Sequence, residues 1–227
     1  MAFLPLAPAV PGRDHHLMRI EILLYEGCDE LDALGPYEVL AGAGAHSGRF
    51  EVRLVTAGPA ATVTAANGAR IVAHGAMSDA ADLLIVPGGG WNARRSEGAR
   101  AQVVRGELPR AIATRHAAGA TVASVCTGAM LLAAAGLLQG RPAITHHSAI
   151  EDLRAAGAEV IDDARVVDDG DVLTAGGVTS GLDLALWIVE RELGAQFAAA
   201  AARELEYERT GRVWHSPTAG SVAGGRL

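Results

Sequence analysis

Two patterns of apolar positions alternate along the chain: short β-rich runs and longer stretches with helical spacing. The β-rich runs predict strands, and they lie at 19–25, 50–56, 83–86, 121–125, 143–145, 159–161, 166–167 and 172–174. Apolar residues three or four positions apart predict helices, and these lie at 31–43, 99–118, 127–138, 148–156, 178–193 and 195–210. Between the second and third strands, Asn67-Gly68 predicts a hairpin.

The alternation of strands and helices predicts a single α/β domain, with a mostly parallel sheet and helices on both of its faces. The strands are apolar at almost every position, as expected where helices cover both faces of a sheet. No repeat or linker divides residues 18–215, and we expect 1–17 and 216–227 to be disordered extensions. In such sheets ligands bind outside the carboxyl ends of the strands. The residues that directly follow a strand are therefore the candidates for function.

Composition narrows the classes of function. Hydrophobic residues make up 50% and charged residues 20% of the 227 residues, which fits a packed core and excludes a disordered chain. The net charge of −7 and the lack of a Lys/Arg cluster argue against nucleic-acid binding. Two cysteines cannot form a disulfide framework, which favours a cytoplasmic protein. Residues 117–140 carry no charge, but their glycines and polar residues favour a buried strand and helix over a membrane span.

The strand 121–125 runs directly into Cys126, and a helix is predicted to begin at the next residue. This is the sequence pattern of a nucleophile elbow, a sharp turn from strand to helix that lifts one side chain above the sheet. A helix N-terminus favours the thiolate form of a cysteine, which is its nucleophilic form. The alternative is a buried, unreactive cysteine, and position alone leaves both interpretations open.

Two other strand ends carry candidate residues. After 83–86, the segment Pro-Gly-Gly-Gly-Trp at 87–91 forms either an oxyanion site, through exposed backbone N–H groups, or an ordinary turn. After the first strand, Asp32 lies in the first turn of a predicted helix, a suitable place for an acid or base at the sheet edge. The neighbouring Asp29 and Glu30 are better explained as acids that stabilise the helix N-terminus.

His146 and His147 follow the predicted strand 143–145, and one of them is expected to face the same edge of the sheet. A histidine beside Cys126 fits nucleophilic catalysis, and a Cys/His/Asp set could bind zinc. Because neither histidine has a typical metal-ligand spacing, we predict no metal. The sequence suggests no organic cofactor either. Five further acids are interpreted as part of a solvated loop: Asp162, Asp163, Asp168, Asp169 and Asp171.

Together these segments resemble the ThiJ/PfpI superfamily, relatives of class I glutamine amidotransferase domains, over residues 19–214. The two most specific segments are Leu-Asp-Ala-Leu-Gly-Pro-Tyr-Glu-Val at 31–39 and Gly-Gly-Val-Thr-Ser-Gly-Leu-Asp at 176–183. They are similar to the isonitrile hydratase subgroup and to the amidotransferase-like sensor domains of AraC-type regulators. The resemblance implies a flavodoxin-like fold and a homodimer.

The resemblance also assigns roles to residues. Cys126 matches the family nucleophile, and Asp32 takes the place of the acid that hydrogen-bonds the cysteine. Thr127 matches a threonine that is important in the isonitrile hydratase subgroup, whereas peptidase members carry His there, which argues against peptidase activity. Gly89, beside Gly88, matches the oxyanion-binding site together with the backbone of Thr127.

The reaction that the resemblance implies is cysteine-dependent hydration of a small electrophile, with an isonitrile giving an N-substituted formamide. The Cys126 thiolate would attack the terminal carbon, and Asp32 would supply the proton and then help water attack the thioimidate. A neutral substrate implies an apolar pocket, and its lining residues would include His146, Trp91 and Tyr37. Trp91 and Tyr37 also fit a role in the core.

Two residues depart from the family pattern, and both affect the expected pocket. His147 stands where relatives often have Trp, and Cys28 is an additional thiol near the same edge. Two other functions stay open beside the hydratase: a thiol-based stress or redox protein, and a non-enzymatic ligand-sensing domain. In each case the expected partner is a small molecule rather than a nucleic acid or a membrane.

Overall fold

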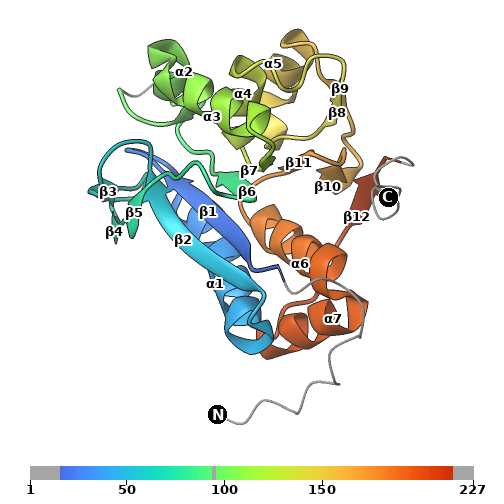
Figure 1. The fold of residues 1–227 in the computed structure, drawn as a ribbon. Helices are drawn as coiled ribbons and strands as arrows, with labels where there is room; N and C mark the ends of the chain where they lie inside the picture. The colour runs from blue at the N-terminus through green and yellow to red at the C-terminus, as the bar shows by residue number, and fades with distance from the viewer. Residues whose placement is uncertain (1–15, 94–95, 217–227) are drawn as a thin grey trace, which may run out of the picture.

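A computed structural model describes residues 16–93 and 96–216 (Figure 1). The strands are β1 (Met18–Leu24), β2 (Phe50–Thr56), β3 (Thr62–Thr64), β4 (Arg70–Val72), β5 (Gly75–Ala76), β6 (Leu83–Val86), β7 (Thr121–Val125), β8 (Pro142–Ala143), β9 (Glu159–Val160), β10 (Ala164–Asp168), β11 (Val172–Ala175) and β12 (Arg212–His215). The helices are α1 (Glu30–Ser47), α2 (Ala99–Arg105), α3 (Glu107–Ala117), α4 (Gly128–Ala134), α5 (Ile150–Ala155), α6 (Ser180–Leu193) and α7 (Ala195–Glu204).

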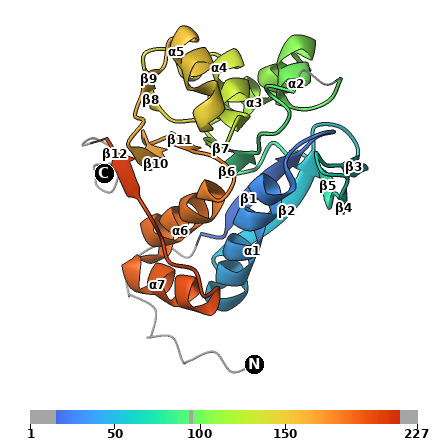
Figure 2. The same cartoon turned by 180° about the vertical axis from the view of Figure 1, so that it is seen from behind.

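The central sheet has eight strands in the order β12-β10-β11-β7-β6-β1-β2-β5. Every neighbouring pair in it is parallel except β10 and β11, which are antiparallel. Helices α1, α6 and α7 cover one face, and α2 to α5 cover the other (Figures 1 and 2). The predicted α/β architecture with a mostly parallel sheet is therefore confirmed.

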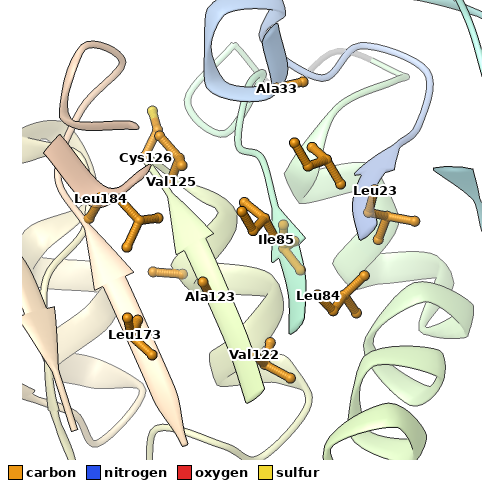
Figure 3. Packing of buried hydrophobic residues seen from close by; sticks show 14 of the residues in the cluster. Leu23, Ala33, Leu84, Ile85, Val122, Ala123, Val125, Cys126, Leu173 and Leu184 are labelled. Atoms are coloured by element: carbon orange, nitrogen blue, oxygen red, sulfur yellow. The ribbon is translucent and has the colours of Figure 1, made fainter. Parts of the chain in front are cut away.

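The core lies where the central strands are covered on both faces. Leu84, Ile85, Val122, Ala123 and Leu173 are all buried in β6, β7 and β11, with at most 1% of their surface exposed. Their side chains fill the space between the sheet and its helices (Figure 3). Burial on both faces explains why these strands are apolar at nearly every position, without the polar alternation of a strand that has one face in solvent.

Most predicted elements are present, and the largest differences lie in the helices after β6 and at the carboxyl end. The predicted helix 99–118 is two helices, because Gly106 adopts the left-handed conformation that ends α2. The predicted helix 195–210 ends at Glu204, and the strand β12 follows it without having been predicted. The predicted hairpin at 67–68 is confirmed as the pair β3 and β4.

The acid-rich segment near β10 is only partly at the surface, and its interpretation as a solvated loop is wrong for Asp168. That carboxylate is 2% exposed and accepts hydrogen bonds from Trp187 Nε1 (2.8 Å) and the Gly170 N–H (2.8 Å). Arg191 of α6 pairs with it as well. The other four acids form ion pairs with arginines: Asp162, Asp163, Asp169 and Asp171.

The uncharged stretch 117–140 forms the buried strand β7 and the short helix α4, as predicted. Within residues 16–93 and 96–216, no helix is both long enough and apolar enough to cross a membrane. The predicted terminal extensions, 1–17 and 216–227, lie outside the described residues except for His16, Leu17 and Ser216.

Candidate active site

Three neighbouring strands of the sheet, β7, β6 and β1, end at one edge and bring the candidate residues together. The three strands are parallel, so their carboxyl ends meet there. Cys126 follows β7, Gly88 and Gly89 follow β6, and Asp32 lies in the first turn of α1, which follows β1. Figure 3 shows the Cys126 sulfur just beyond the tip of β7, pointing away from the apolar core below.

Cys126 occupies a strained turn. Its φ is +58°, in the left-handed region that side chains other than glycine rarely adopt. Its N–H donates to the carbonyls of Ala175 (3.1 Å) and Gly176 (2.8 Å), and its carbonyl accepts from Thr145 Oγ1 (2.9 Å). Such strain costs about 1–3 kcal/mol and persists only where surrounding contacts enforce it. These contacts hold the predicted nucleophile elbow.

The elbow also depends on a close approach between β6 and the start of α4. A Cβ added at Gly128 would lie 2.1 Å from the Val86 carbonyl oxygen. Only glycine fits there without moving either β6 or the start of α4. Beside it, Thr127 Oγ1 accepts a hydrogen bond from the Gly89 N–H at 3.0 Å. The Gly-rich segment and the elbow are thus fastened to each other.

Asp32 is fully buried in the first turn of α1. Its Oδ2 accepts the Gly88 N–H at 2.9 Å, while its Oδ1 has no hydrogen-bond partner at ordinary geometry among the described residues. Burial, and then the charge of the nearby Asp29, raise the pKa of this carboxyl to about 8. The Gly88 N–H and the Cys126 thiol, both as hydrogen-bond donors, oppose that rise in pKa.

Burial raises the pKa of the Cys126 thiol to about 12, and the Asp32 carboxylate adds to the effect. The backbone N–H groups of Val178 and Thr127 act in the opposite direction. The N–H of Thr127, at the start of α4, therefore favours the thiolate as predicted, but the pKa of the thiol is raised overall. α4 contributes its N–H groups, but desolvation and a neighbouring carboxylate outweigh them. The pair of Asp32 and Cys126 holds its protons strongly near neutral pH.

Tyr25 is a residue of this site that the sequence analysis missed. Its hydroxyl donates to the carbonyls of both Pro87 (2.7 Å) and Gly88 (2.9 Å), and the Asp29 N–H also donates to Gly88 O (2.9 Å). Burial raises the Tyr25 pKa well above its ordinary value, so the hydroxyl keeps its proton and stays a donor. The available signal was its position at the end of β1.

Of the two histidines, His146 lies against the site. It is half-buried whereas His147 is exposed, and the two rings lie 4.1 Å apart between centroids. A Cβ added at Gly177 would lie 2.5 Å from His146 Cδ2, so the ring contacts the loop that follows β11. Burial, and then His147, lower the pKa of His146. Its Nδ1 is 2.8 Å from Ser148 Oγ.

The two aromatic residues expected in a pocket pack against other parts of the protein. Trp91 is 9% exposed, donates from Nε1 to Asp152 Oδ2 (2.6 Å) and lies under the Arg100 guanidinium. Tyr37 is half-buried against the core, with its ring 5.9 Å from that of His74. Trp91 is therefore part of the core, which is the second of the two roles expected for it. Tyr37 lies on α1 and packs against the core.

The other groups near α1 have structural partners. Asp29 caps the helix by accepting the Leu31 N–H (3.0 Å), and Glu30 accepts from Asn67 in the hairpin (2.8 Å), as the sequence interpretation expects. Cys28 is fully buried, and burial raises its pKa to about 11. Among the residues that the structure describes, no three His, Cys, Asp or Glu side chains are grouped to hold a metal ion.

Comparison with known proteins identifies the family. The model of the DJ-1/PfpI family matches residues 18–191. The chain belongs to this family. It is 34% identical to an isonitrile hydratase of Pseudomonas putida over 84% of this chain and 78% of that one. A ThiJ/PfpI family crystal structure from Pseudomonas syringae superposes with a TM-score of 0.75 at 29% identity, covering 92% of this chain and 85% of that one.

Regulators are also among the relatives of this DJ-1/PfpI family chain. It is 28% identical to the HTH-type transcriptional regulator GbdR of Pseudomonas aeruginosa over 89% of its length, which is 54% of the regulator. The resemblance to the superfamily and to isonitrile hydratase is confirmed, and the similarity to GbdR shows that a regulator is among the relatives as well. The relatives of this chain therefore include both a named enzyme and a regulator. Because one fold can carry different functions, function has to be argued from the residues of the site.

Proposed function

We propose that this protein is a cysteine-dependent hydratase that adds water to a small, neutral electrophile, and that an isonitrile is converted to an N-substituted formamide. Cys126 is the nucleophile and Asp32 is the general acid and base. The observation that carries the proposal is the buried carboxyl of Asp32, with a pKa of about 8, directly beside the thiol on the strained elbow. The 34% identity to an isonitrile hydratase supports the choice of substrate.

The active form of the pair holds one proton. In that form Cys126 and Asp32 share a single proton. The pair is then either a thiolate beside a protonated carboxyl group or a thiol beside a carboxylate. A protonated carboxyl in a dry site can donate to substrate carbon at neutral pH, which a solvated aspartate with a pKa near 4 cannot do. The raised pKa of Asp32 thus suits it to this transfer.

The reaction balances without any oxidant. The Cys126 sulfur bonds to the terminal isonitrile carbon, and the proton from Asp32 goes to the same carbon, which gives a thioimidate R–N=CH–S. The Asp32 carboxylate then takes a proton from water as the water oxygen bonds to that carbon, and Asp32 passes this proton to the nitrogen, which gives R–NH–CH(OH)–S. The C–S bond breaks, its electron pair returns to sulfur as the thiolate, the hydroxyl proton returns to the Asp32 carboxylate, and R–NH–CHO leaves. The only net change is the addition of one water molecule to the isonitrile.

Thr127, Gly88 and Gly89 hold this arrangement in place. The N–H groups of both glycines are already engaged, one with Asp32 and the other with Thr127 Oγ1. For either glycine to serve as part of an oxyanion site, the developing charge on the substrate has to take over one of these hydrogen bonds. The Thr127 N–H already faces the sulfur, and it is the donor best placed to stabilise charge on the Cys126 adduct.

The test is formamide formation from simple alkyl isonitriles by the purified protein. Cys126→Ala removes the nucleophile, and Cys28→Ala is the matched control because it removes the other buried thiol of the chain. We expect turnover by the wild type and Cys28→Ala and none by Cys126→Ala. Turnover by a folded Cys126→Ala variant would overturn the mechanism.

The same experiment separates the two alternative functions. Peroxide-dependent oxidation of Cys126 without hydration would favour a thiol-based stress or redox protein, although a 6% exposed thiol with a raised pKa is a poor peroxide sensor. Binding of a small molecule without turnover would favour a sensing domain, as the relationship to the regulator suggests. Hydration remains the function that the Asp32–Cys126 pair supports best.

A further inference from the structure

The loop Gly176–Thr179, between β11 and α6, lies directly against the nucleophile elbow. Ala175 and Gly176 accept the Cys126 N–H, so the loop begins on the backbone of the reactive residue. Two residues later, Val178 has a φ of +33°, a left-handed conformation that is costly for a β-branched side chain. In this conformation its N–H faces the Cys126 sulfur, where it favours the thiolate.

One residue outside the loop contacts both of its ends. The main-chain carbonyl of Arg165 accepts the Gly176 N–H at 2.9 Å, and its Nη2 donates to Thr179 Oγ1 at 3.1 Å. The direction of the guanidinium is set by Asp183, which accepts from Arg165 Nε at 2.7 Å. Asp183 is 3% exposed and also accepts from the Tyr207 hydroxyl at 3.0 Å, so this ion pair is anchored in the protein.

We propose that Arg165, held by Asp183, is a positioning residue: it clamps the loop Gly176–Thr179 at both ends and so keeps the strained Val178 peptide directed at the Cys126 sulfur. The proposal rests on the proposed function in one respect, that Cys126 is the nucleophile. It adds Arg165, Asp183 and Thr179 to the site, although none of the three touches the reacting atoms.

The physical reason is that backbone strain persists only where neighbouring contacts enforce it. Without the bond to Thr179, Val178 can relax to a negative φ, and its N–H then turns away from the sulfur. Hydrogen bonds to a charged acceptor are stronger than those to a neutral one. The loss therefore falls on the thiolate more than on the thiol, and less of the nucleophile is present at a given pH.

Two variants break the clamp without removing the ion pair. Thr179→Val replaces the hydroxyl at an exposed position with a side chain of the same shape, and the Thr179 side chain makes no capping hydrogen bond to α6. Arg165→Lys keeps a positive charge for Asp183 but lacks the second arm that reaches Thr179. The control is Asp168→Asn. Asp168, like Asp183, is a buried carboxylate in an ion pair between β10 and α6, but its partner Arg191 lies near the far end of α6.

The measurement is the rate at which iodoacetamide alkylates Cys126 between pH 7 and 9, followed peptide by peptide so that Cys28 is counted separately. We expect both clamp variants to react at least threefold more slowly than the wild type at each pH, with urea midpoints near that of the wild type. Asp168→Asn should lower the urea midpoint and leave the alkylation rate unchanged.

Three results would overturn the proposal: an unchanged rate in both clamp variants, a faster rate, or equal slowing in Asp168→Asn. The readout needs no isonitrile, so it is independent of the reaction assigned above. If the wild type is alkylated and the variants slow it while hydration is absent, the clamp stands and the proposed reaction fails. If Cys126 in the folded wild type is not alkylated at all, both proposals fail.

Discussion

Asp32→Asn replaces the central carboxyl with an amide of the same shape. We expect this variant to lose activity and to gain stability at pH 8. The amide oxygen can still accept the Gly88 N–H that Asp32 accepts at 2.9 Å. The variant can neither donate nor accept the transferred proton, and general acid–base catalysis contributes about 10²–10⁴-fold. We therefore expect formamide formation to fall by about that factor.

The effect on stability follows from the pKa of Asp32, which rises from 3.8 to about 8 on folding. A carboxyl with a raised pKa in the folded state binds its proton more tightly there, so the wild type loses stability as pH rises from about 4 to about 8. The difference of about 4 pKa units corresponds to roughly 6 kcal/mol. In Asp32→Asn, the amide N–H₂ at the position of Oδ1 has no hydrogen-bond partner, which costs about 1–3 kcal/mol of stability. Subtracting this cost from roughly 6 kcal/mol, we expect Asp32→Asn to be more stable than the wild type at pH 8 by about 3 kcal/mol or more.

Urea unfolding of both proteins at pH 5 and pH 8 measures this difference directly. Asp32→Asn should be clearly more stable at pH 8, and most of its advantage should be absent at pH 5. Removing the Asp32 charge should also speed alkylation of Cys126 at a fixed pH, because that charge raises the thiol pKa. Equal pH dependence of the two proteins, or hydration at the wild-type rate, would refute the reasoning about Asp32.

Three further results follow from the same geometry. kcat/KM should rise about tenfold per pH unit up to about pH 8 and then level off, because the pair of Asp32 and Cys126 must lose one of its two protons to reach the active form. A flat profile would contradict the one-proton form. Gly128→Ala should unfold at clearly lower urea than the wild type, since its Cβ would lie 2.1 Å from Val86 O, and an unchanged midpoint would refute the close approach. Tyr25→Phe should cost about 1–2 kcal/mol in urea unfolding through the lost hydroxyl bonds to Pro87 and Gly88, and lower kcat more than KM; unaltered kinetics would show that this contact is only structural.

Sequence reasoning succeeds where local pattern and burial agree. The strands β2, β6 and β7 have the predicted bounds 50–56, 83–86 and 121–125. β6 and β7 are buried on both faces, and such a run is apolar at nearly every position. The rule that ligands bind at the carboxyl ends of parallel strands correctly predicted that Cys126, Asp32 and the Gly88 segment lie at one edge of the sheet. Each of these follows a strand whose position was predictable.

The parts that were missed depend on contacts between segments far apart in the chain. β12 is a four-residue strand with polar residues at both ends, and only its pairing with β10 makes it a strand. Asp168 is buried because Trp187 and Arg191, both on α6, surround it. No periodicity within 162–171 indicates such partners.

The chemistry of the site was predicted less well than its location. A helix N-terminus favours a thiolate, but the thiol of Cys126 is buried and lies beside a carboxyl group, and both effects raise its pKa. Desolvation depends on what covers a side chain, which the sequence does not state. The strained Val178 peptide has the same origin, because only the folded loop against Arg165 imposes its conformation.

A covalent adduct on Cys126 is the central claim, and acid quenching during turnover followed by mass spectrometry tests it most directly. The thioimidate contains the whole isonitrile, so the mass of the protein should increase by that of one substrate molecule, and the added mass should map to the peptide that contains Cys126. Cys28→Ala should give the same adduct, and Cys126→Ala none. Formamide production without any adduct on Cys126, or with an adduct on another residue, would contradict the account.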